Sequence, residues 1–90
     1  MSIHKEHRKR LRDRFIKEGL DNFDELYVLE LLLFYCIPRV DTNPIAHRLL
    51  ERFGTLNNVL NASAYELEKV EGVGKNTSTF LTLITQVGRY

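Results

Sequence analysis

The sequence predicts a small all-α protein with five to six short helices. Its 90 residues suffice for one domain with a modest core. Hydrophobic residues make up 43% of the chain, which is ordinary for a folded protein. Apolar residues recur at helical spacing between glycines, prolines and capping residues, and no stretch shows the convincing alternation of a strand. The only cysteine, Cys36, excludes a disulfide within the chain and suits a reducing compartment, so we expect a cytoplasmic location.

The first expected helix runs from His4 to Glu18 and ends at Gly19. Residues 1–17 contain seven Lys or Arg and two acidic residues, a net charge of +5. Residues 18–41 contain one arginine and six acidic residues, a net charge of −5. Such an asymmetry is typical of nucleic-acid contact, but charged runs are also common on solvated helices.

We therefore divide the chain into a basic N-terminal helix, residues 1–19, and a main helical unit, residues 20–90. Two interpretations of the basic helix stay open. Arg8 and Arg12 either contact phosphates or lie on a solvated surface, paired with neighbouring acidic residues.

The second helix, from an N-cap at Asp24 to about Cys36, is apolar nearly all round, so we expect it to be buried at the centre. Glu30 interrupts this apolar run. Its carboxylate must reach solvent or pair with a basic residue, because an unpaired buried charge is costly. Pro38 ends the helix.

The third helix is expected to start at Asn43 as N-cap, with Asp41 or Thr42 as alternatives, and to end at Phe53. Thr55 caps a short fourth helix that extends to about residue 60.

The fifth helix has Ser63 as N-cap and Glu66 three residues later, which together form a capping box, and Gly72 ends it. The sixth helix opens at Lys75. Its expected buried face comprises Phe80, Leu81, Ile84 and Val87, with the small residue Ser78 where the two helices cross.

The turn Gly72-Val73-Gly74 is the most informative motif of the chain. Gly72 allows a left-handed backbone, Val73 is expected to pack between the two helices, and Gly74 allows a partner to approach the backbone. Free amides at the start of the following helix, together with its dipole and Lys75, could then face a phosphate.

This arrangement resembles a helix-hairpin-helix motif, which binds nucleic-acid backbones without reading base sequence. The alternative is a plain helical hairpin whose glycines only permit a tight turn. A P-loop does not fit, because no glycine stands five residues before Gly74 and no Ser or Thr follows Lys75 directly. The candidate nucleic-acid contacts of the motif are Gly72, Val73, Gly74, Lys75, Asn76 and Thr77.

A degenerate copy of the hairpin precedes it. The second helix, the loop 38–43 and the third helix echo the later hairpin, with Ala46 in the place of Ser78. This first turn has no glycine and carries Arg39. Arg39 could reach a phosphate through its side chain, although an ion pair with Asp41 is the interpretation that we favour.

Three blocks of sequence resemble the N-terminal region of RadC-like proteins, the UPF0758 family. They are His7–Phe15 with Gly19-Leu20, Leu29–Thr42, and Ala46 with Leu49–Gly54 and Gly72–Gly74. The resemblance implies a tandem helix-hairpin-helix unit, similar to SAM domains and RuvA domain 2, and a historical link to DNA repair. In this family a JAB/MPN-type metal-dependent domain follows, with a His-x-His pair and an Asp as metal ligands. The chain lacks such a pair, so it is expected to be an N-terminal domain without its metal-dependent partner.

The expected function is therefore non-sequence-specific binding to a DNA backbone. The alternative is a protein–protein interaction or dimerisation domain that positions the absent metalloprotease-like domain, and a homodimer fits either role. We expect no catalysis, metal, cofactor, membrane or small-molecule substrate for these 90 residues. They offer no nucleophile with a base and no ligand cluster, and Leu29–Ile37 is too short to span a membrane.

Overall fold

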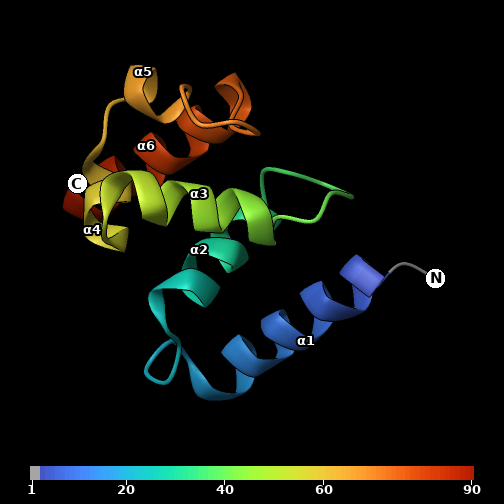
Figure 1. Cartoon of the computed structure of the whole chain (residues 1–90). Coiled ribbons are helices and arrows are strands. Elements are labelled where there is room, and N and C mark those ends of the chain that lie inside the picture. Colours follow the sequence, from blue (N-terminus) through green and yellow to red (C-terminus); the bar gives the residue numbers. More distant parts are fainter. Residues whose placement is uncertain (1–2) are drawn as a thin grey trace.

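The computed structural model describes residues 3–90, and these form six helices without a strand. This confirms the predicted all-α class. The helices are α1 (Ile3–Glu18), α2 (Glu25–Phe34), α3 (Asn43–Phe53), α4 (Leu56–Asn61), α5 (Ala64–Leu67) and α6 (Lys75–Arg89). In Figure 1, α1 lies along the bottom of the view, α2 and α3 cross the middle, and α5 and α6 lie at the top. No helix of this described part is long and apolar enough to cross a bilayer.

One hydrophobic core joins the two hairpins, α2 with α3 and α5 with α6, and the short helix α4 between them. Its centre consists of five fully buried leucine and valine side chains from five different helices: Leu29, Leu49, Val59, Leu67 and Leu81. Because each helix from α2 to α6 contributes one of them, the turn between α5 and α6 is fixed by the same core that holds α2 and α3.

A second, smaller cluster attaches α1 to α2. It contains Leu11, Leu31 and Phe34, all buried. At the other end of α1, the Arg14 guanidinium donates to the Asn22 carbonyl oxygen at 2.6 Å. The two helices are therefore antiparallel neighbours, with a thin apolar contact between them.

The buried Glu30 carboxylate joins α1, α2 and α3. It has no exposed surface, and it accepts hydrogen bonds from His7 Nε2 at 3.2 Å and Asn43 Nδ2 at 3.3 Å. Of the two predicted outcomes, solvent or a basic partner, the structure shows the second. The partner is a histidine from α1, assisted by an amide.

The helix N-caps follow the sequence at three of four predicted positions. The side chains of Asp24, Thr55 and Ser63 accept from the amides three residues later. The N-cap of α3 is Thr42, which the prediction gave as an alternative to Asn43, because the Thr42 carbonyl already accepts the first helical bond, from the Ala46 amide at 2.9 Å.

The fifth helix is shorter than predicted. It ends at Leu67, and the amides of Lys69 and Val70 bond to carbonyls only three residues back. Val70 nevertheless lies in the core, three residues after the fully buried Leu67. The capping box is half formed: Ser63 Oγ accepts from the Glu66 amide at 3.2 Å, but the Glu66 carboxylate pairs with Lys69 at 3.0 Å.

The predicted buried face of α6 ends earlier than expected. Leu81 is fully buried and Phe80 and Ile84 are partly buried, but Val87 is 64% exposed. At this level α6 faces α4 through Thr85, whose hydroxyl donates to the Leu60 carbonyl at 2.7 Å. Val87 therefore lies on the outer side of the helix.

Candidate nucleic-acid interface

The two glycines of the hairpin turn have different roles. Gly72 has φ +95°, and a Cβ there would lie 2.8 Å from Ile45 Cγ1 on α3. The backbone of the turn thus rests directly on α3, where no side chain fits. Val73 is buried, as predicted, and its amide donates to the Val70 carbonyl at 3.0 Å.

Gly74, in contrast, borders open space. Its backbone is extended (φ −98°, ψ −171°), and a Cβ there would meet no heavy atom within 4 Å. The fold itself does not require a glycine at this position. What the missing side chain leaves open is the approach to the N-terminus of α6.

Four consecutive amides face this approach. Within residues 3–90, the amides of residues 74–77 have no hydrogen-bond acceptor, and the first paired amide of α6 belongs to Ser78, which donates to the Gly74 carbonyl at 3.0 Å. The 15-residue helix adds the positive end of its dipole. This end of α6 can therefore accommodate an anion.

The side chains of the motif divide into exposed and structural ones. Lys75 is exposed. Asn76 Nδ2 donates to the Cys36 carbonyl at 3.0 Å and so ties α6 to the end of α2. Thr77 is buried next to Cys36. Asn76 and Thr77 can thus offer their backbone amides to a phosphate, while their side chains hold the hairpin in place.

Two further contacts stabilise the turn. Ser78, the small residue at the helix crossing, is fully buried, and its hydroxyl donates to Glu68 Oε2 at 2.6 Å. Arg48 Nη1 on α3 donates to the Glu71 carbonyl at 3.1 Å. Sequence reasoning missed Arg48. The sequence shows only that Arg48 lies about one helical turn after Ile45. This position indicates a contact with the turn only once Gly72 is known to pack on Ile45.

Arg39 takes the place of Gly72 in the first hairpin. It has φ +67°, as the only non-glycine residue with positive φ in the described chain. The favoured ion pair with Asp41 is absent from the described residues, because Asp41 Oδ1 accepts from the Asn43 amide at 3.1 Å instead. The Arg39 side chain is exposed.

Arg8 is engaged within the protein. Its guanidinium donates to three carbonyls at the end of α2, those of Phe34 (3.2 Å), Ile37 (2.6 Å) and Val40 (2.8 Å), and lies 4.9 Å from the centre of the Phe34 ring. Burial and the neighbouring Arg12 lower the pKa of Arg8 from its ordinary value. A phosphate contact by Arg8 would compete with these bonds. Arg12 has no hydrogen-bond or ion-pair partner in the described part of the chain.

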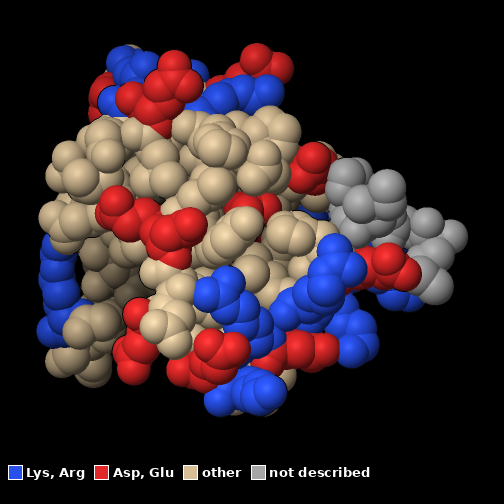
Figure 2. Space-filling view, turned by 60° about the horizontal axis from the view of Figure 1, so that its bottom comes forward, with Lys and Arg blue, Asp and Glu red and all other residues tan. Residues whose placement is uncertain are grey.

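The predicted contacts belong to different helices, but they meet at the segment that follows α2, where Asn76 donates to the Cys36 carbonyl and Arg8 to the Ile37 carbonyl. The turn 72–77 lies at the top of Figure 1, whereas Arg8 and Arg12 belong to α1 at the bottom. Figure 2 brings the α1 side forward and shows many Lys and Arg side chains near the grey N-terminal residues, with acidic side chains among them. The charges on this side are therefore mixed, without a continuous basic surface.

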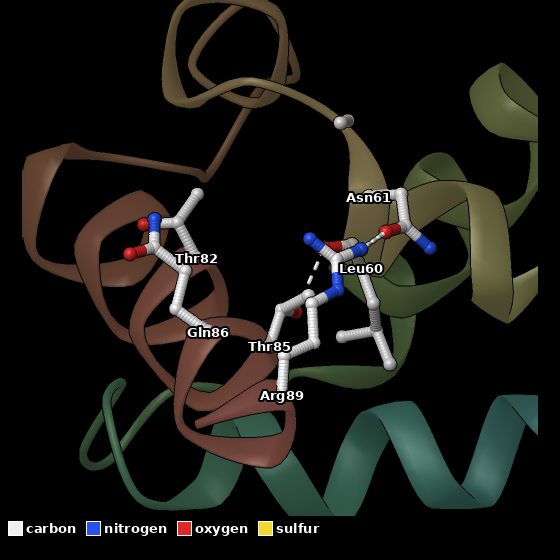
Figure 3. Close-up of a pocket in the computed structure, with 7 residues that line it drawn as sticks. Leu60, Asn61, Thr82, Thr85, Gln86 and Arg89 are labelled. Atoms are coloured by element: carbon white, nitrogen blue, oxygen red, sulfur yellow. Dashed lines mark hydrogen bonds between the residues drawn. The ribbon is translucent and has the colours of Figure 1, made fainter.

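The pocket between α4 and α6 is small and polar. Figure 3 shows Thr82, Thr85, Gln86 and Arg89 of α6 facing Leu60 and Asn61, with Arg89 donating to the Asn61 side chain. Its volume of about 90 Å³ is well below that of an ordinary cofactor site. Residues 3–90 contain no group of three or more His, Cys, Asp or Glu side chains placed to hold a metal ion.

Comparison with known proteins shows relatives over most of the chain. A UPF0758 protein from Fusobacterium nucleatum is 51% identical over 81 residues, which are 90% of this chain and 35% of that protein. UPF0758 proteins from Ruegeria pomeroyi and Rhodobacter capsulatus are 44% and 43% identical over 89% and 72% of this chain, and over 36% and 30% of their own lengths. The chain thus spans about a third of the length of these relatives. No family model and no solved structure matches it.

Proposed function

We propose that this chain, whose helical region belongs to the UPF0758 family as its sequence blocks predict, binds the phosphate backbone of DNA through the hairpin between α5 and α6. The observation that carries the proposal is the N-terminus of α6. Within residues 3–90, the amide of Gly74 and the three amides that follow it have no acceptor, and the fold does not require a glycine at position 74. Amides arranged in this way bind a phosphate without reading bases.

The charges near the turn support a weak interaction. Lys75 is exposed beside the free amides, and Arg48 uses one nitrogen on the Glu71 carbonyl and leaves its other donors available. The Glu71 side chain is exposed in the same turn and opposes an anion. A single hairpin that neutralises one or two phosphates should lose about 3- to 12-fold in affinity between 50 and 200 mM salt.

In the longer relatives, a domain of this kind would hold the rest of the protein on nucleic acid. The reason for this part of the proposal is that about two thirds of each relative's length lies outside the region that matches this chain. The chemistry performed there is not assigned to the present chain.

The test is fluorescence anisotropy with a labelled mixed-sequence DNA duplex, a single strand and an RNA duplex, each at 50 and 200 mM salt. We expect weak, salt-dependent binding to the DNA duplex, and a loss of at least about fivefold for Gly74→Glu, because the new carboxylate occupies the phosphate position.

Gly88→Glu is the matched control. Gly88 also borders open space on α6, and the substitution adds the same charge at the far end of the helix. Its affinity should stay within about twofold of the wild type, since distant exposed charges are screened. Absence of binding at 50 mM salt would refute the proposed function. Equal losses in both variants would refute the hairpin as the contact.

A further inference from the structure

A shallow apolar groove runs between α1 and α2. These two helices lie at the bottom and in the middle of Figure 1, and the hairpin turn lies at the top. The groove holds about 200 Å³. Six side chains line it: Phe15, Leu20, Val28, Leu31, Leu32 and Tyr35. No element of the described chain covers this groove.

The rim of the groove is also apolar. Phe15 is 42% exposed, Leu20 44% and Tyr35 65%, and Ile16 next to Phe15 is 78% exposed. Single exposed apolar residues are normal, but three large ones that line one apolar groove are typical of a surface that binds another protein.

Free charges lie at opposite ends of this groove. Because α1 and α2 are antiparallel, Arg12 lies toward the end near Tyr35, next to Arg8 and the last turn of α2. Glu18 and Asp21 lie at the other end, around Leu20. Within residues 3–90, neither Arg12 nor these two carboxylates has an ion-pair or hydrogen-bond partner.

We propose that a second copy of this chain covers the groove, so that the protein forms a two-fold dimer through α1 and α2. A two-fold axis across the groove places its basic end on the acidic end of the other copy, and the reverse. Each Arg12 then faces Glu18 and Asp21 of the other chain, while the apolar rims pack together. No arrangement of the two grooves in the same direction satisfies these charges, because like charges would meet.

This dimer differs from the proposed nucleic-acid contact in location. The groove involves α1 and α2, whereas the turn 72–77, in which Gly74, Lys75 and Asn76 are exposed, lies at the top of Figure 1. The dimer would therefore carry two hairpins, and a DNA backbone that reaches both would be bound more tightly than by one.

The test is sedimentation equilibrium of the whole chain from 5 µM to 1 mM. We expect a reversible monomer–dimer equilibrium, weakened at least about tenfold by Tyr35→Glu, because a charge enters the apolar contact. Val87→Glu is the control. It places the same charge on an equally exposed apolar residue of α6 and should leave the dimer unchanged.

A charge exchange tests the direction of pairing. Arg12→Glu should weaken the dimer about fivefold, since it places a carboxylate against Glu18, and Arg12→Glu combined with Glu18→Arg should restore most of the loss. Circular dichroism verifies that each variant is folded. If Tyr35→Glu unfolds, Ile16→Glu replaces it.

Three results would overturn the proposal: a monomer at every concentration, a dimer that only Val87→Glu dissociates, or a double exchange no better than the single one. Loss of DNA binding with an intact dimer would contradict the proposed function alone. A monomer that still binds DNA would contradict this inference alone.

Discussion

Replacing the two glycines of the hairpin by alanine should separate a structural glycine from one that leaves space for a ligand. At Gly72, an L-residue at positive φ costs roughly 1–2 kcal/mol. The new Cβ would also lie 2.8 Å from Cγ1 of the buried Ile45, and such overpacking costs roughly 1–3 kcal/mol. The reduced freedom of the unfolded chain returns about 0.4–1 kcal/mol. Gly72→Ala should therefore lower the free energy of unfolding by about 1–5 kcal/mol.

Gly74→Ala should be nearly neutral. The backbone there is extended and the Cβ position is empty, so neither strain nor a clash arises. Alanine is a poorer N-cap than glycine by about 0.5–1 kcal/mol. The unfolded-state effect offsets most of this cost, about 0.4–1 kcal/mol.

Urea denaturation followed by circular dichroism at 222 nm measures both variants. We expect parallel transitions with equal slopes, and a midpoint that shifts clearly only for Gly72→Ala. A larger loss for Gly74→Ala than for Gly72→Ala would refute the assignment of roles to the two glycines. An unchanged urea midpoint for Gly72→Ala would show that α3 shifts to accommodate the new methyl group.

Three other sites give predictions of their own. Thr42→Val should raise the free energy of unfolding by about 1 kcal/mol in urea denaturation, because the Thr42 hydroxyl is buried without a partner; a clear loss would show that the hydroxyl is bonded. Arg39→Gly should raise the melting temperature, with a gain of about 0.5–1 kcal/mol from relief of the positive φ; a lower melting temperature would contradict the strain. Burial raises the pKa of the Cys36 thiol above its ordinary value, so the folded protein at pH 8 should react with a thiol reagent at least about 100-fold more slowly than in urea; equal rates would contradict its burial. As the pH rises above about 9, the thiol ionises in the unfolded chain before it does so in the folded protein, and the free energy of unfolding therefore decreases.

Local rules predict local features of this chain well. Asp24, Thr55 and Ser63 cap helices because their side chains bond to amides only three residues away, and this geometry is contained in the sequence. Glycine at positions 72 and 74 likewise marked the turn. The sequence did not show that the two glycines have different roles. That difference depends on the contact of Gly72 with Ile45, which lies far away in sequence.

Most of the errors arise where tertiary contacts decide. The Arg39–Asp41 pair fails for a local reason, since the Asp41 carboxylate accepts from the Asn43 amide two residues away. Val87 has the correct helical spacing for the core, yet α4 meets the opposite side of α6. Arg48 carries no sequence motif at all, and only the packing of the turn on α3 reveals its bond to Glu71.

The attachment of α1 determines which piece of this chain can be moved to another protein. A chain trimmed to start at residue 20 would remove the His7 donor from the Glu30 carboxylate and leave Asn43 as its remaining side-chain donor, and it would open three carbonyls to water. Besides carrying a charged surface, α1 therefore supplies hydrogen-bond donors to buried and partly buried groups of the first hairpin. When hairpins are exchanged between relatives, by recombination or by design, the resulting protein should fold if the transferred segment includes His7 and Arg8.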